Sequence, residues 1–364
     1  MKPLPLFLAL GLSVPTLCQA CATVTYESGL PNNVSITDES ALIFWNAQMH
    51  TEHFVRQASF RTKAKDFGFL VPTPSKPQLG VAEDELFSDL ERELLPRTKT
   101  IVQRGVHFTP LISTVIGASS SEESAYGAAG NTAANAAASS DENEVEVVEQ
   151  RRVGDYNASV LRASDVRSLA KWLRKHRYAV SSDTREWLTP YVKAGFFLTA
   201  FQIVSDVNQE SAQAKAVRLT FKSDAPFFPY RETRHQQKQR GERTLRVFYI
   251  GDDRVQGRIE NGTKVTSWPA TVEYSSPMDA RSLRDSGLSI SNKPLRLTAF
   301  LDDQSPRPGW GDLRFDSSPD QTEIAPAPYI VHKDKRWWFP LDILFLGACS
   351  LVLVSLFLRK KSLT

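Results

Sequence analysis

The pattern of apolar and polar positions predicts a chain rich in β-strands. Residues 41–45 form a short continuous apolar run, as in a buried strand, residues 52–60 alternate more loosely, and residues 67–71 are followed by prolines that end a third strand. The turn signals Gly154-Asp155 and Asn261-Gly262 each lie between two strand-like runs, and the second is typical of a hairpin. Other predicted strands lie at 99–116, 196–204, 217–221, 244–250, 264–268, 271–274 and 295–301.

Three helices are predicted among these strands. Apolar residues recur every four positions between 82 and 94, and Pro96 ends that helix. A second helix has Ser164 as its expected N-cap, Asp165 in its first turn, and four basic residues at its C-terminal end, where the helix dipole favours cations. A third, shorter helix begins near Asp183 and is closed by Gly195. The fold class is therefore α+β, a strand-rich mixed body with about three helices.

The N-terminal segment has the composition of a secretory signal peptide. One basic residue is followed by a short apolar run and by small residues before the expected cleavage site, between Ala20 and Cys21. Because the run is short and interrupted by prolines, a retained membrane segment is the less favoured alternative. Cys21 would become the first residue after cleavage, and lipidation of its thiol remains open as a second, minor alternative.

The C-terminal segment predicts a transmembrane helix. Residues 338–358 contain a single ionisable side chain, Asp342, and 21 residues at about 1.5 Å each match a hydrocarbon core of about 30 Å. Trp337 and Trp338 lie at one edge, where indoles favour the headgroup region, and Arg359, Lys360 and Lys361 follow the other edge. A buried core helix and a sorting tail that is later removed are the alternatives.

Together the two ends predict a single-pass protein of the bacterial inner membrane with its bulk in the periplasm. The expected order is a signal peptide, an extracytoplasmic α+β domain, a stalk rich in Pro, Asp and Ser, a transmembrane helix and a cytoplasmic tail, at 1–20, 21–302, 303–336, 337–358 and 359–364. A low-complexity stretch, 117–144, is predicted to be a mobile insertion or a linker between domains, because it has too few apolar residues to offset its ordering entropy.

Charge and cysteine content narrow the function classes. Of the 44 Lys and Arg and the 41 Asp and Glu residues, four basic and one acidic lie outside 21–336, so the body holds 40 of each. A neutral body argues against nucleic acid as a partner, because phosphate binding needs a concentrated cationic surface. The exported body would contain only Cys21, so no intrachain disulfide is expected.

No residues are assigned as catalytic, cofactor-binding or metal-binding. His50 and His53 are three residues apart in a strand-like context that points them to opposite faces, unlike the paired histidines of a metalloprotease helix. The acidic pairs Asp252-Asp253 and Asp302-Asp303 are interpreted as turn residues. The aromatic residues of 227–230 and Trp310 are candidates for a peptide or glycan groove, although core packing is the favoured interpretation.

Several short motifs, in their order along the chain, resemble a bacterial family filed as domain of unknown function twenty-three thirty. They include the segments at 51–56, 66–74, 153–156, 169–173 and 221–226. The resemblance covers about residues 21–300 and therefore implies one composite domain with an insertion. It implies an exported protein, often with a C-terminal membrane segment, and it carries no known activity and no catalytic residues.

These observations predict a binding or scaffolding role at the bacterial cell envelope. The expected partners are the lipid bilayer and an envelope protein or glycan, and no cofactor is expected. The alternative is an extracytoplasmic hydrolase without a recognisable motif. A pocket in which titratable groups of shifted pKa converge would favour the hydrolase, whereas a filled interior with shallow grooves would favour the binding protein.

Overall fold

The computed structural model divides the chain into two compact units, Met1–Leu95 with Ala134–Ala325, and Pro96–Ala133 with Pro326–Thr364. Each unit is described by itself. The structure describes residues 23–25, 34–62, 67–109, 145–203, 211–213, 215–237, 243–278, 294–335 and 337–361. The expected cleavage site at Ala20 and Cys21 and the low-complexity stretch 117–144 lie outside these residues.

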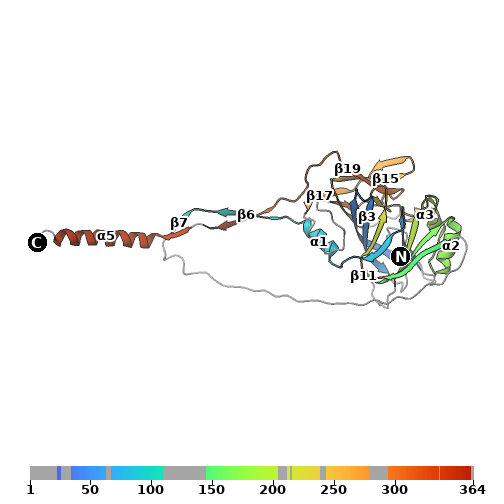
Figure 1. The fold of residues 1–364 in the computed structure, drawn as a ribbon, viewed down its shortest axis with the longest axis horizontal. Coiled ribbons are helices and arrows are strands. Elements are labelled where there is room, and N and C mark those ends of the chain that lie inside the picture. Colours follow the sequence, from blue (N-terminus) through green and yellow to red (C-terminus); the bar gives the residue numbers. More distant parts are fainter. Residues whose placement is uncertain are drawn as a thin grey trace, which may run out of the picture. The chain divides into compact units, whose positions relative to one another are not determined.

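An eight-stranded sheet forms the centre of the first unit (Figure 1). Its order is β17-β18-β14-β2-β3-β12-β5, with β11 paired to β3, and its neighbours are antiparallel except for β14 and β2. The strands are β2 (Val34–Asn46), β3 (Thr51–Thr62), β5 (Gln78–Val81), β11 (Ser211–Gln213), β12 (Val217–Lys222), β14 (Thr244–Gly251), β17 (Thr271–Met278) and β18 (Leu295–Asp302).

The apolar run in β2 explains why this sheet is covered on both faces. Ala41 and Ile43 belong to one buried cluster, and Leu42 and Phe44 belong to another, as the two-residue period of a strand requires. The second cluster includes Leu86, Phe87 and Leu90 of α1 (Leu86–Glu93), so α1 covers that face. A sheet buried on both faces needs continuous apolar strands rather than alternating ones.

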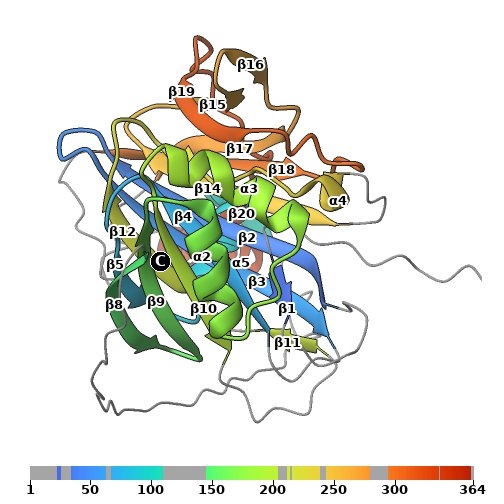
Figure 2. The same ribbon diagram turned by 90° about the vertical axis from the view of Figure 1, so that its right-hand side faces the viewer.

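A five-stranded antiparallel sheet covers the other face. It contains β1 (Thr23–Thr25), β4 (Phe67–Thr73), β10 (Phe197–Ile203), β9 (Tyr156–Ala163) and β8 (Val145–Val153) in that order. Its outer face is covered by α2 (Val166–Lys175) and α3 (Ser182–Lys193), which lie in front of β9 and β10 in Figure 2. The buried side chains of Leu173 and Leu188 pack there with Leu161 of β9 and Leu198 of β10.

A small antiparallel sheet completes the first unit, in the order β13-β19-β15-β16. Its strands are β13 (Phe227–Phe228), β19 (Asp312–Ser317), β15 (Val255–Asn261) and β16 (Lys264–Ser267), and the short helix α4 (Arg234–Gln237) follows β13. The predicted hairpin at Asn261-Gly262 joins β15 to β16, and Gly262 has the positive φ of 60° that such a turn requires.

The second unit contains two pairs of parallel strands and a helix. β6 (Thr98–Gln103) pairs with β20 (Tyr329–Asp334), and β7 (Val106–Thr109) pairs with β21 (Trp337–Pro340), which leads directly into α5 (Leu341–Lys361). Trp337 and Trp338 therefore lie in a strand. In the part of the chain that the structure describes, no helix is long and apolar enough to cross a membrane.

The strand-rich α+β class is confirmed, and α1, α2 and α3 lie where helices were predicted. The N-cap of α2 was assigned incorrectly. Asp165, not Ser164, accepts the hydrogen bonds of the Arg167 and Ser168 amides, because its carboxylate reaches two free N–H groups of the first turn. Residues 303–336, expected to be a stalk, are divided, since β19 lies in a sheet of the first unit and β20 in the second.

Candidate functional site

An open groove of about 430 Å³ lies in the first unit, beside α3. One wall is a face of α3, and the others come from the segment that leads into α4, from the end of β15 and from the loop before β19. The lining side chains are Asp183, Glu186, Trp187, Thr189, Pro190, Lys193, Arg231, Glu232, Thr233, Arg234, Gln237, Asn261 and Trp310.

The helix wall is held by a cap at its N-terminus and by a tryptophan in its middle turn. The Ser181 hydroxyl caps α3 by accepting the amide of Thr184, at 3.1 Å. Further along, the indole of Trp187 is 3% exposed and donates to the carbonyl of Arg231, at 2.8 Å, which ties α3 to the opposite wall. The residues at 183, 186, 190 and 193 then share one face of the helix, because three and four positions separate neighbours on a helix surface.

Trp310 is presented to the groove by two glycines that have no room for a side chain. A Cβ at Gly309 would lie 2.6 Å from Cγ of Glu232, and a Cβ at Gly311 would lie 2.4 Å from the carbonyl oxygen of Glu260. The ammonium of Lys264 lies 3.9 Å from the centre of the Trp310 ring, a cation–π distance. The indole is therefore held at the groove by close backbone packing on either side.

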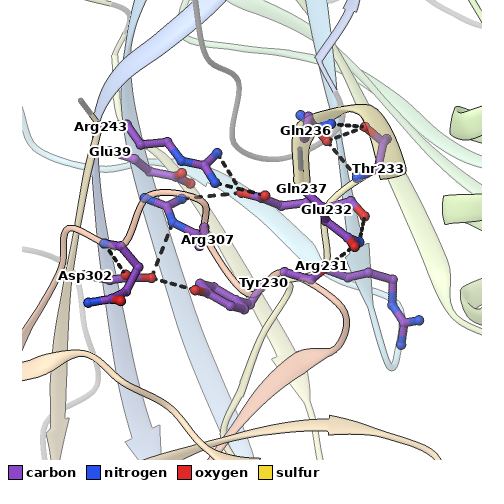
Figure 3. Close-up of polar contacts among 12 residues, drawn as sticks. Glu39, Tyr230, Arg231, Glu232, Thr233, Gln236, Gln237, Arg243, Asp302 and Arg307 are labelled. Carbon is purple, nitrogen blue, oxygen red and sulfur yellow. Dashed lines mark hydrogen bonds and ion pairs between the residues drawn. The ribbon is translucent and has the colours of Figure 1, made fainter. Parts of the chain in front are cut away.

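Behind this wall lies a network of buried charges (Figure 3). The carboxylate of Glu232 accepts two contacts from Arg243, at 2.8 and 3.0 Å, and both side chains are at most 2% exposed. Arg307 approaches the same carboxylate at 3.7 Å. The amide of Glu232 donates to the carbonyl of Gly309, at 2.8 Å. The network therefore fixes the groove wall and the loop that carries Trp310.

Asp302 is the second acid of this network. It accepts hydrogen bonds from the Tyr230 hydroxyl at 2.7 Å and the Trp268 indole at 3.3 Å, and Arg307 lies 3.3 Å away. Burial, together with the neighbouring Asp302 charge, raises the pKa of Tyr230 far above its ordinary value, so the phenol stays a neutral donor. Asp302 does act as a turn residue, because its Oδ1 accepts the amide of Gln304 at 3.0 Å. It also ends β18 and is fully buried, which its interpretation as a turn residue did not predict.

The acids beside the groove are engaged with structural partners. Burial raises the pKa of Glu232, while the cations of Arg243 and Arg307 act in the opposite direction. Asp312 accepts the Tyr191 hydroxyl at 2.6 Å and the Arg231 amide at 3.2 Å. Its pKa is also raised by burial and lowered in part by the guanidinium of Arg231. These contacts hold walls together and suit binding better than proton transfer.

At the rim, the groove carries charges of both signs. Glu186 of α3 pairs with Arg234 across the opening, at 2.6 Å, and both side chains are more than half exposed. The lining contains the acids Asp183, Glu186 and Glu232 and the bases Lys193, Arg231 and Arg234. The two sets cancel, so the groove favours neither an anion nor a cation by net charge.

Of the aromatic residues considered from the sequence, only Trp310 lines the groove. Phe227, Phe228 and Tyr230 are at most 3% exposed, which confirms the interpretation as core packing for these three. Glu232, Arg243 and Arg307 could not be recognised as buried from the sequence, because charged residues in a polar stretch are ordinarily exposed. The pair of glycines around Trp310 is consistent with a close backbone approach there, but it identifies none of these three residues.

The two histidines do not come together around a ligand. His50 lies in the turn after β2, with φ of 46°, near the ring of Trp45, whereas His53 lies in β3 with Nδ1 2.9 Å from the Thr220 hydroxyl. Burial, with a smaller effect of the Arg218 charge, lowers the pKa of His53 to about 4. Among the described residues, no group of three or more His, Cys, Asp or Glu side chains could hold a metal ion.

Glu52, between these histidines, is fully buried. Its Oε2 accepts the amide of Phe227 at 2.8 Å, and its Oε1 has no hydrogen-bond partner among the residues that the structure describes. Burial raises the pKa of Glu52 well above the ordinary value, against smaller opposing effects of the Phe227 amide and the Arg314 charge. The carboxyl therefore joins β3 to β13 within the core, away from the groove lining.

Comparisons with known proteins give a family and a weak structural likeness. A family model described as "Uncharacterized protein conserved in bacteria (DUF2330)" matches residues 15–302. Among solved structures, the chain is similar to one described as the crystal structure of baculovirus P35, with a TM-score of 0.37 and 9% sequence identity, over 84% of this chain and 98% of that one. No curated protein matches the chain in sequence.

Proposed function

The chain belongs to DUF2330, a family of uncharacterized bacterial proteins, as its motifs predicted, and since that family assigns no activity, we propose a function from the chain's own sequence and geometry. The protein is a membrane-anchored, extracytoplasmic binding protein of the bacterial cell envelope. Its ligand site is the groove beside α3. The observation that carries this proposal is a preformed groove in which an indole is displayed and buried ion pairs fix the walls.

The groove supports binding rather than hydrolysis. A general acid or base needs a carboxyl or imidazole that can reach a substrate with its proton free to move. Glu232 and Asp312 are instead held by arginine and tyrosine behind the wall. Rigid walls that are already ordered before the ligand arrives reduce the entropy lost on binding.

A glycan is the ligand class that this lining fits best. Its charges cancel, which suits an uncharged polar ligand. Planar amide, carboxylate and guanidinium groups can each bond to hydroxyls, and an aromatic ring such as that of Trp310 offers an apolar face beside them. An extended peptide is the alternative occupant, and it serves as a competing ligand in the test below.

The membrane anchor rests on the apolar segment 338–358. Support comes from the sequence, in which these 21 residues contain one ionisable side chain and would extend about 30 Å as a helix. Phe345, Leu351 and Phe357 are each more than 70% exposed along it, and exposed apolar surface of this extent needs a cover. Bases flank both ends, at 333–336 as well as 359–361. The orientation therefore rests on the N-terminal signal segment rather than on the positive-inside rule.

The groove is tested by titrating the full-length chain, purified in detergent, with chitotetraose while its tryptophan fluorescence is followed. We expect a saturable change that is lost in Trp310→Ala. Trp172→Ala is the matched control, because Trp172 is also half-buried but stacks on His176 at the end of α2. No change with the glycan, or a change only with an unstructured peptide, would refute the glycan assignment. Turnover of the glycan would favour the hydrolase.

The anchor is tested separately by fractionation. The full chain should stay in the membrane pellet after an alkaline carbonate wash. A reporter fused after Thr364 should lie on the cytoplasmic side, whereas one inserted in the body should lie outside. Release of the intact chain by the wash, or the opposite reporter pattern, would exclude the proposed topology.

A further inference from the structure

The helix α2 lies on the outer face of the five-stranded sheet (Figure 2), and its exposed side is basic. Leu169 and Leu173 are buried toward the sheet. The exposed side carries bases at intervals of three and four residues, which is the spacing of neighbours on a helix surface. Together with the base just past the end of the helix, they form what we call the α2 row: Arg167, Lys171, Arg174, Lys175 and Arg177.

The α2 row is not balanced by acids in its own stretch of the chain. The sequence from 166 to 182 contains no acidic residue. Among the residues that the structure describes, Lys171, Arg174 and Arg177 have no ion-pair partner. Exposed bases of other elements do pair, as Arg92 does with Asp89 in α1, at 2.7 Å. The α2 row therefore holds cations that are available to an external anion.

The helix dipole explains only part of the α2 row. Its negative end favours cations in the last turn, such as Lys175, but its positive end disfavours Arg167 in the first turn. Asp165 lies 3.6 Å from Arg167, yet its carboxylate is already engaged as the cap of α2. Lys171 has a like charge four residues away on each side, an arrangement that weakens a helix. An anion bound across these bases relieves that repulsion.

Arg177 occupies a backbone position that ordinarily favours glycine. Its φ is 67°, in the left-handed region, where a side chain costs energy. The amides of Arg177 and Tyr178 donate back to the last turn of α2, at 2.9 and 2.8 Å, a pattern that ends many helices. α3 ends with the same two hydrogen bonds, and there the left-handed residue is Gly195, with φ of 73°. The chain therefore keeps a base where glycine would be more stable.

The neutral charge of the whole body conceals the α2 row, because acids gather in the opposite layer. α1 covers the face of the central sheet that points away from α2 and α3. That helix and the residues before it contain six acids: Glu83, Asp84, Glu85, Asp89, Glu91 and Glu93. The two outer layers of the first unit thus differ in charge, and the argument from net charge does not apply to α2 alone.

We propose that the α2 row binds a linear acidic polysaccharide, whose successive carboxylates pair with its bases. A guanidinium binds a carboxylate through two parallel hydrogen bonds, and a lysine binds it as a point charge. From Arg167 to Lys175 the row extends about 12 Å, so it can contact several sugars of one chain. This site is separate from the groove. Only the choice of a cell-envelope polymer rests on the extracytoplasmic location proposed above.

A lipid surface fits the α2 row less well than a single polymer chain. A helix that binds a membrane surface buries large apolar side chains in the lipid. α2 and α3 expose no large apolar side chain, and the half-buried Trp172 stacks on His176, at 3.7 Å between ring centres. The neighbouring helix α3 also contains Asp183 and Glu186, which a flat anionic surface would approach. A flexible chain can follow the bases and avoid these acids.

The test is binding of fluorescent decagalacturonate to the full chain in non-ionic detergent, followed by fluorescence anisotropy. We expect saturable binding that weakens as salt is added, because the bases are exposed. The uncharged maltodecaose should not compete. Chitotetraose, the probe of the groove, should not displace the decagalacturonate either, so a failure of the groove and a failure of the α2 row are observed separately.

Two variants separate binding from folding. The triple variant Lys171→Gln, Arg174→Gln, Arg177→Gly should lower the affinity about tenfold, since each exposed ion pair contributes a factor of up to about five. Arg177→Gly alone should weaken binding and yet raise the urea midpoint of unfolding, because glycine adopts the left-handed conformation without strain. A purely structural role for Arg177 predicts a lower midpoint instead.

The matched control is the triple variant Lys76→Gln, Arg92→Gln, Lys215→Gln, which removes the same charge from exposed bases of other elements. It should change the affinity by less than about twofold. The proposal is overturned by an absence of binding, by an equal loss in the control, or by a lower urea midpoint in Arg177→Gly. Displacement by chitotetraose would place the polymer in the groove and overturn it too. Displacement by micelles containing phosphatidylglycerol, at a lower concentration of charges, would assign the α2 row to lipid instead.

Discussion

The buried pair between Glu232 and Arg243 allows one prediction to be worked out in detail. Both side chains are at most 2% exposed, and Arg307 is a second, more distant cation at 3.7 Å. In Arg243→Met the stem of the side chain is retained and the guanidinium is lost. The Glu232 carboxylate then stays buried without its closest partner, which is strongly destabilising even where the intact pair adds little.

Protonation of Glu232 limits how much unfolding free energy the Arg243→Met variant can lose. At pH 7, neutralising a carboxyl with an ordinary pKa of 4.5 takes 2.5 pH units, or about 3.4 kcal/mol at about 1.36 kcal/mol per unit. At about pH 5.5 the same step takes about 1.4 kcal/mol. We therefore expect Arg243→Met to lower the free energy of unfolding by about 3 kcal/mol at pH 7 and by about 1 kcal/mol at pH 5.5.

The direction of this pH dependence follows from the linkage between proton binding and folding. In the variant, the pKa of Glu232 is higher in the folded chain than in the unfolded chain, so the folded chain holds its proton more tightly. The stability that this carboxyl contributes is complete below its unfolded pKa and is lost as the pH rises through its folded pKa. The deficit of the variant must therefore grow from acid toward neutral pH.

Urea unfolding of the full chain in detergent, followed by tryptophan fluorescence at both pH values, measures this deficit. Arg234→Met is the matched control, because the Arg234–Glu186 pair is as short, at 2.6 Å, but 69% and 52% exposed. The control should lose less than about 1 kcal/mol at either pH. A deficit for Arg243→Met that is no larger than that of the control, or that does not shrink in acid, would refute the reasoning.

Three smaller changes test other parts of the fold by the same unfolding measurement. Gly309→Ala should lower the free energy of unfolding by about 1–3 kcal/mol and weaken the glycan response of Trp310 by moving its loop. An unchanged unfolding curve and glycan response would contradict the close approach. Glu52→Gln should gain stability relative to the natural chain as pH rises. Burial raises the pKa of Glu52, so the stability that its carboxyl contributes is lost above its folded pKa. A difference in unfolding free energy between variant and natural chain that does not change with pH would contradict this. Ser181→Ala should lower the free energy of unfolding by about 1 kcal/mol, whereas Ser181→Asp, whose carboxylate can still cap the Thr184 amide, should leave it unchanged.

The helices and the central strands could be predicted from the sequence because local patterns determine them. The continuous apolar run in β2 predicted a buried strand, and its alternate residues do pack into two separate clusters. The helix cap was misplaced by one residue, Ser164 for Asp165, since both residue types cap equally well. Only the three-dimensional path of the chain decides which side chain reaches the free amides.

The charge network could not be predicted, because its members are far apart in the sequence. Glu39 and Arg56 form a second buried pair, at 2.6 Å, between β2 and β3. In the sequence, Glu39 and Asp302 each stand next to another acid or a polar residue and resemble exposed positions. Burial of such groups depends on partners that arrive from other strands, and a pattern of apolar positions carries no information about them.

The network also shows that the folding unit continues past the end of the family match at residue 302. Asp302 and Glu232 lie within the match, yet Arg307, which contacts both carboxylates, lies beyond it. β19 also lies beyond the match, and it is the strand that joins β13 to β15. Without residues 303–317 the acids would lose a shared cation and the small sheet its middle strand. The groove, whose Trp310 comes from the same stretch, is therefore built by the matched region and the sequence after it together.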